Sequence, residues 1–302
     1  MKEREVVSII IPTYKRTTDV LARAIASAQN QSYKDVEIVV VDDNAKKDCD
    51  SFRANNIKLL NELSLKDKRI KTILNKTNLG GALSRNEGIK SCSGKYVTFL
   101  DDDDYFLEDK VLHQVNYMIS NNVNFSFTDL YLYNSNNKVI DIRDRSDIKD
   151  FSKGALLKYH IIRNITGTET FMSTKELLEN VGYFDDCLTG HEFYLMLKIL
   201  LSNESTIGYF KSNDIVAYRT SASSISNGPH KIDGENAIYS KKKEFFGLLN
   251  AKEKRLVKCR HKAVLGISFF RRKNRIKGFL YIVDAFLTSP VTIIKAILFK
   301  KI

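Results

Sequence analysis

The chain has 302 residues, with 48 Lys and Arg against 36 Asp and Glu, and a formal net charge of +12. This length allows one large or two small domains with a sizeable core. A composition of 43% hydrophobic and 10% aromatic residues excludes a disordered chain. The four cysteines lie far apart without a CxxC pair, which argues against a zinc site and fits a reducing compartment.

Four segments in the first hundred residues have the composition of buried strands. They cover residues 6–11, 36–41, 70–74 and 96–100. They are mainly apolar rather than alternating, which is typical of a parallel sheet covered on both faces. Three of them run into polar or acidic residues, namely Pro12 and Thr13, Asp42 and Asp43, and Asp101 to Asp104.

Segments with helical spacing separate these strands. Apolar residues recur at intervals of three and four over 20–28 and 111–118, and 78–81 is a turn that leads into a helix. Alternating strands and helices predict an α/β fold with a mainly parallel sheet flanked by helices. Because the carboxyl ends of parallel strands share one edge, we expect the polar residues that follow the strands to line one cleft.

Four consecutive carboxylates, Asp101 to Asp104, follow the fourth strand. Neighbouring like charges repel, so such a cluster needs a cation in the folded state. Mg²⁺ and Mn²⁺ prefer carboxylate oxygens and keep positions open for substrate phosphates. We therefore predict a metal at this edge. An acidic turn that caps the next helix is the alternative, and Asp104 suits that role.

The order and spacing of four motifs resembles glycosyltransferase family 2. The motifs are SIIIPTYKR at 8–16, EIVVVDDN at 37–44, NLGG with SRNEGI within 78–89, and GKY through the four aspartates at 94–104. The resemblance implies a GT-A fold, a Rossmann-like mixed sheet flanked by helices, with a C-terminal helical extension. It implies a glycosyltransferase domain at 1–225, with a nucleotide-sugar half at 1–110 and an acceptor half at 111–225. Residues 226–302 would form a basic amphipathic helical region.

The resemblance also implies roles for individual residues. Those that would contact the nucleotide sugar are Pro12, Thr13, Tyr14, Arg16, Asp43, Asp101 and Asp102. Asp43 would hydrogen-bond the base, usually uracil, and Asp103, with Asp101, would hold Mn²⁺ or Mg²⁺ as the DxD element. A divalent ion that bridges both phosphates would neutralise the leaving group. Arg85 has two interpretations, a phosphate contact or a surface ion pair.

A predicted helix near residue 191 carries the candidate general base. The family commonly has an acidic pair here, and in this sequence His191 takes the first place and Glu192 the second. Apolar residues three, four and seven positions later put Glu192 on the core-facing line at the helix N-terminus. There it could take a proton from an acceptor hydroxyl. His191 is the second candidate, and a carboxylate that only stabilises the helix dipole is the alternative.

The resemblance thus implies an inverting, metal-assisted glycosyltransferase in cell-surface polysaccharide synthesis. It would move a sugar from a nucleotide sugar, a UDP-sugar, to a hydroxyl of a glycan or lipid-linked acceptor. Two alternatives stay open. A sugar-phosphate nucleotidyltransferase usually has a Gly-rich loop after its first strand, and residues 12–17 hold no glycine. A non-catalytic partner protein that binds nucleotide sugars would have no use for a base.

The excess positive charge lies in the C-terminal region. Residues 252–302 hold 14 Lys or Arg and two acids, and the remaining chain carries 34 of each sign. Basic residues among bulky apolar ones suit an anionic membrane surface, and the region is too apolar for a nucleic-acid partner. Asp284, Ser289-Pro290 and Lys295 interrupt 279–299, which argues against a transmembrane span and predicts a new short helix from Pro290.

These features, with no signal peptide expected from residues 1–5, predict a cytoplasmic chain that is peripheral on the cytoplasmic face of the membrane. Two other uses of the C-terminal helices stay open. They could pack on their own domain with their charges in water, or pair with a second copy of the chain as a homodimer.

Overall fold

The computed structural model describes residues 5–45, 49–134, 136–165, 167–187, 189–218 and 230–299. These residues form two compact units. The first comprises 5–151, 167–186 and 198–218, and the second comprises 152–165, 187–197 and 230–299. The domain boundary predicted at residue 225 lies outside the described residues, and the two predicted functional halves stay predictions.

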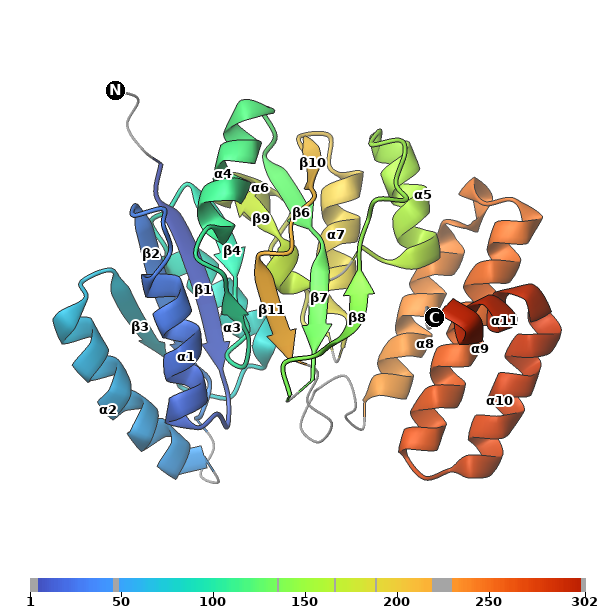
Figure 1. Ribbon diagram of the computed structural model, residues 1–302, viewed down its shortest axis with the longest axis horizontal. Coiled ribbons are helices and arrows are strands. Elements are labelled where there is room, and N and C mark those ends of the chain that lie inside the picture. The colour runs from blue at the N-terminus through green and yellow to red at the C-terminus, as the bar shows by residue number, and fades with distance from the viewer. Residues whose placement is uncertain are drawn as a thin grey trace. The chain divides into compact units, whose positions relative to one another are not determined.

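The first unit is built on a seven-stranded sheet in the order β10-β6-β9-β4-β1-β2-β3 (Figure 1). The strands are β1 (Val7–Thr13), β2 (Val36–Asp42), β3 (Ile70–Leu74), β4 (Tyr96–Phe99), β6 (Phe125–Thr128), β9 (Met172–Thr174) and β10 (Ile207–Phe210). β1 pairs in parallel with β2 and β4, and β2 pairs in parallel with β3. β9 is antiparallel to β4 and β6, so the predicted mixed, mainly parallel sheet is confirmed.

A second sheet of four strands, in the order β5-β11-β7-β8, belongs to the same unit. Its strands are β5 (Tyr105–Phe106), β11 (Ile215–Tyr218), β7 (Leu130–Tyr133) and β8 (Val139–Arg143). The helices of this unit are α1 (Thr18–Gln29), α2 (Asp50–Lys66), α3 (Gly81–Ser91), α4 (Lys110–Ser120) and α6 (Lys175–Asn180). They supply the flanking helices that the alternating pattern predicts.

Burial on both faces explains why the central strands are mainly apolar. Ile9 and Ile11 of β1 are fully buried in one core cluster with Leu21 of α1. Ile10, which points the other way, lies against Gly88 of α3, where an added Cβ would come within 2.5 Å of its Cγ2 atom. Successive strand residues therefore enter two different packing layers, and both faces are mainly apolar.

The second unit is helical. It contains α5 (Lys153–Arg163), the first part of α7 (His191–Leu201), α8 (Lys231–Glu244), α9 (Ala251–Arg271), α10 (Arg275–Thr288) and α11 (Pro290–Phe299). α9 begins with a capping box in which Asn250 and Glu253 exchange side-chain hydrogen bonds with each other's backbone amides. The predicted short helix from Pro290 is confirmed as α11. None of the described helices is long and apolar enough to cross a membrane.

Candidate active site

The ends of β1, β2 and β4 meet at the carboxyl edge of the large sheet, as the sequence predicts. Thr13 is in register with Asp42, and its carbonyl accepts a hydrogen bond from the Asp43 amide at 2.9 Å. The Tyr14 amide donates to Asp102 Oδ2 at 3.3 Å, which ties the end of β1 to the residues after β4. Thr13 is buried and Tyr14 is 37% exposed, so the edge has a packed floor and an accessible aromatic rim.

Arg16 neutralises two of the four aspartates. Its Nε donates to Asp102 Oδ1 at 2.9 Å, and its Nη2 donates to Asp103 Oδ2 at 3.0 Å. Burial raises the pKa of both carboxyls, that of Asp103 to about 6, although Arg16 opposes the shift. A guanidinium thus binds one carboxylate oxygen of Asp103, the residue that the sequence predicts as the metal ligand.

Arg85 of α3 neutralises a third aspartate. Its side chain forms an ion pair with Asp101 and also donates to the Gly81 carbonyl at 3.1 Å. Arg85 is buried and the Asp101 side chain is 37% exposed, so the observed contact is an ion pair at the rim of the edge. A cation fixed beside Asp101 at this edge is suitably placed for a phosphate, and that role stays a prediction.

Three carboxylates converge at the same edge. One carboxylate oxygen each from Asp101, Asp104 and Glu169 lies within 4.8 Å of the other two. Glu169 is 8% exposed, and in the described chain no other residue's side chain donates a hydrogen bond to its carboxylate. Burial and the nearby charge of Asp101 raise the pKa of Glu169 to about 7. Asp104 and Glu169 are buried and Asp101 is partly exposed, and three oxygen donors at this spacing fit one hard divalent cation.

Glu169 is the residue that sequence reasoning missed. Thr168–Thr170 form a 3-10 turn, and β9 starts only at Met172. The turn begins after Gly167, whose φ of 117° suits glycine. A carboxylate two residues after a glycine was the available signal, but nothing in the local sequence connects it to Asp101.

Asp43 holds a turn of its own chain. Its two oxygens accept four hydrogen bonds, each at 2.8 Å, from the side chains of Asn75 and Asn78 and from the amides of Leu79 and Gly80. A carboxylate offers about four acceptor positions, so these donors fill its capacity. The NLGG segment is therefore a turn organised by Asp43, and the contact between Asp43 and the nucleotide base stays a prediction.

Glu192 and His191 lie in the first turn of α7, in the second unit. The His191 Nε2 atom is 3.7 Å from Glu192 Oε2, and their side chains are 17% and 27% exposed. Leu195 and Met196 are fully buried, as the predicted core-facing line requires. The helix starts directly after Gly190, whose φ is 78°. The two candidates are thus accessible at a helix N-terminus, and the role of each as a base stays a prediction.

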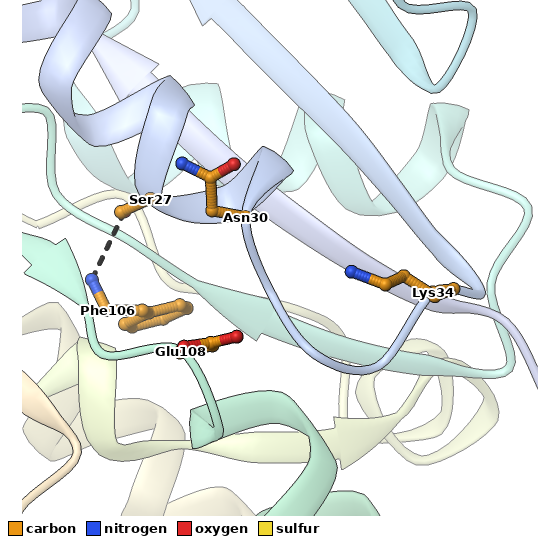
Figure 2. A pocket seen from close by; sticks show the side chains of 5 residues that line it. All are labelled: Ser27, Asn30, Lys34, Phe106 and Glu108. Carbon is orange, nitrogen blue, oxygen red and sulfur yellow. Dashed lines mark hydrogen bonds between the residues drawn. The ribbon is translucent and has the colours of Figure 1, made fainter.

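A surface depression of about 480 Å³ lies beside α1 and β5 (Figure 2). Ser27, Asn30, Lys34, Phe106 and Glu108 line it. The Phe106 amide donates to Ser27 Oγ at 3.2 Å. None of these residues belongs to the acidic edge, so the depression is separate from the candidate active site.

A mainly parallel sheet whose carboxyl edge carries clustered aspartates defines a GT-A type nucleotide-binding fold. The model of the family described as Glycosyl transferase family 2 matches residues 8–181, and the chain belongs to that family. A solved structure with the same fold is S. aureus TarS 1–349 in complex with UDP-GlcNAc. It has a TM-score of 0.58 and 15% identity, over 92% of this chain and 90% of that one.

Three curated relatives illustrate the range of similarity. An uncharacterized glycosyltransferase of Haemophilus influenzae is 36% identical over 129 residues, 41% of this chain and 48% of the relative. The Escherichia coli UDP-Glc:alpha-D-GlcNAc-diphosphoundecaprenol beta-1,3-glucosyltransferase WfgD is 29% identical over 230 residues, 74% of this chain and 81% of the relative. The GalNAc(5)-diNAcBac-PP-undecaprenol beta-1,3-glucosyltransferase of Campylobacter jejuni is 44% identical over 101 residues, 33% of this chain and 30% of the relative. The chain spans about half or less of the first curated relatives that it matches.

Proposed function

We propose that the chain is an inverting glycosyltransferase that moves a sugar from a UDP-sugar to a hydroxyl of a lipid-linked glycan. The observation that carries this proposal is the edge of the family-2 sheet, where carboxylates and two arginines converge on one place. The names of the E. coli and C. jejuni relatives specify undecaprenol-linked acceptors, and TarS structures hold UDP-GlcNAc or UDP. These support the same donor and acceptor classes here.

The donor diphosphate would lie at the acidic edge. Asp101, Asp104 and Glu169 present the oxygen donors that Mn²⁺ or Mg²⁺ prefers, and Asp103 would join them if Arg16 turned from it to a phosphate. When bound, the ion would neutralise the departing diphosphate. Arg16 and Arg85 would orient the phosphates, because guanidinium groups bind phosphate oxygens in a fixed geometry.

Glu192 is the proposed general base, with His191 as the second candidate. The acceptor oxygen would attack the anomeric carbon as its bond to the diphosphate oxygen breaks, and the acceptor proton would pass to the Glu192 carboxylate. Direct displacement at an α-linked donor gives a β-linked product. Because the chain belongs to family 2, this reaction is favoured over nucleotidyl transfer.

The first test is calorimetric binding of a panel of nucleotide sugars with Mn²⁺. We expect one UDP-sugar to bind only with the metal, and Asp103→Ala and Glu169→Gln each to weaken that binding by about tenfold or more. Glu108→Gln is the matched control, because this exposed carboxylate lies outside the acidic edge. If every nucleotide sugar fails to bind, or if binding is indifferent to the metal and to both variants, the proposed donor site is wrong.

The second test separates an enzyme from a binding-only protein. Glu192→Gln should keep the donor affinity while transfer to an undecaprenol-linked acceptor falls by about a hundredfold or more. His191→Gln, measured in the same assay, shows which of the two residues takes the proton. Full transfer in both variants would exclude this pair as the base.

A further inference from the structure

Helices α10 and α11 follow one another at the end of the second unit (Figure 1), and each exposes large apolar side chains. The apolar face consists of Ile276, Phe279, Leu280, Val283, Phe286, Leu287, Val291 and Ile294. Each is between 37% and 77% exposed. Single exposed apolar residues are ordinary, but a row of eight along two consecutive helices marks an interaction surface.

The apolar face of α10 points away from α9. On the opposite side of α10, Gly278 and Ala285 are buried. There a Cβ at Gly278 would come within 2.9 Å of the Phe270 ring, and a Cβ at Gly266 of α9 would come within 2.8 Å of Ile282. Small residues thus let the two helices pack closely on one side. The exposed residues recur at intervals of three and four and form a second apolar side, which packing on α9 leaves uncovered.

Positive charge borders the apolar face at one end. The basic tip, at the turn between α9 and α10, consists of Arg271, Arg272, Lys273, Arg275 and Lys277, all exposed. It includes a shallow surface depression of about 410 Å³. Asp284 is the acidic residue of α10, and it accepts a hydrogen bond from Lys262 Nζ at 2.6 Å. The basic tip therefore concentrates positive charge at one end of the apolar face.

We propose that the apolar face and the basic tip together bind the surface of an anionic lipid bilayer. α10 would lie in the plane of the interface, with Phe279, Leu280 and Leu287 among the acyl chains and the basic tip on lipid phosphates. Charge complementarity favours a bilayer over a second copy of the chain, because the basic tip would bring like charges into a symmetric contact.

The biological role of this membrane binding rests on the proposed function, since a lipid-linked acceptor is presented at a bilayer. Binding itself requires no donor and no turnover. The apolar face then explains how a chain whose described helices do not span a membrane meets its acceptor.

The test is co-sedimentation of the full chain with vesicles of phosphatidylcholine and phosphatidylglycerol, compared with phosphatidylcholine alone. We expect wild type to bind the anionic vesicles and to lose affinity as salt rises. Replacing Phe279, Leu280 and Leu287 together by Ser should weaken binding by at least about tenfold. Replacing Arg272, Lys273 and Arg275 by Gln should weaken it and flatten its salt dependence.

A matched control replaces Leu65, Val139 and Ile140 by Ser, which are exposed apolar residues of the first unit. This control should bind like wild type. Equal vesicle binding by wild type and the apolar-face variant, or no wild-type binding, would overturn the inference. A further contradicting outcome would come from sedimentation velocity. Wild type would be a dimer, the apolar-face variant would be a monomer, and vesicle binding would be the same for both.

Donor calorimetry on the same samples separates the two proposals. Vesicle binding without nucleotide-sugar binding would contradict the proposed function alone. Nucleotide-sugar binding without vesicle binding would contradict only the membrane inference. We also expect the apolar-face variant to keep transfer to a short water-soluble acceptor and to lose transfer to an acceptor embedded in vesicles.

Discussion

At the scale of single residues, the carboxylates of the acidic edge differ in the groups that stabilise their charge. Arg16 forms ion pairs with Asp102 and Asp103, and Arg85 forms one with Asp101. Backbone amides and asparagine side chains donate hydrogen bonds to both oxygens of Asp43. A run of aspartates in the sequence therefore becomes several chemically distinct sites. The number of hydrogen bonds to each carboxylate, rather than its place in the run, decides what else it can bind.

Asp43 gives a direct test of this distinction. Asp43→Ala removes the acceptor of four hydrogen bonds, two of which come from the Leu79 and Gly80 amides of the NLGG turn. We expect the free energy of unfolding to fall by about 3 kcal/mol. Urea denaturation of the protein without donor measures it. An unchanged stability together with lost donor affinity would show that Asp43 acts mainly on the base.

Lys110 provides a prediction about pH. Its side chain is fully buried, donates to Thr98 Oγ1 and lies 4.2 Å from the centre of the Phe106 ring. Burial lowers the pKa of Lys110 to about 7. Because this lies below the value of about 10.4 in an unfolded chain, the folded state binds fewer protons between those values. Stability should therefore rise with pH across that window.

Lys110→Met should remove that pH dependence. The variant should be more stable than wild type by about 2 kcal/mol at pH 7, and the difference should shrink towards pH 10. Thr98 keeps a hydrogen-bond partner in the variant, since its hydroxyl also donates to the Phe171 carbonyl. Thermal unfolding from pH 6 to pH 10 measures the effect. If the stability of both proteins changed with pH in the same way, the predicted effect of Lys110 would be wrong.

At the scale of elements, close packing of α3 on β1 positions one side of the acidic edge. α3 carries Arg85, and Gly88 lets the helix approach Ile10. Displacing this helix would move Arg85 relative to Asp101. The apolar pattern of β1 predicts that both of its faces are buried, but the glycine at the contact point becomes meaningful only once the partner is known.

Gly88→Ala tests this packing. The new methyl group would overlap Ile10, so we expect a loss of about 1 to 3 kcal/mol in the free energy of unfolding. Gly154→Ala on α5 is the matched control, because an added Cβ there meets nothing within 4 Å. In that control the free energy of unfolding should rise by up to about 1 kcal/mol, since alanine favours a helix. Equal urea midpoints for both variants would contradict the packing argument.

At the scale of the whole molecule, the four cysteines are free thiols in the structure. Cys49, Cys92 and Cys259 are buried, and Cys187 is partly exposed. We expect a thiol reagent to label one cysteine in the native protein and four after unfolding. A native count of two or more would mean that a buried cysteine is reached by local opening.

The sequence alone determined the α/β class, the parallel strands, the family and the meeting of Thr13, Asp43 and Asp101 at one edge. Strands buried on both faces are mainly apolar, and the carboxyl ends of parallel strands lie at one edge of a sheet. These features can therefore be predicted from short segments of the sequence. Only the tertiary structure decided that Arg16 binds carboxylates 86 and 87 residues away, and that Glu169 joins Asp101. It also decided which side of α10 is exposed, because two apolar sides look alike in a sequence until one of them packs.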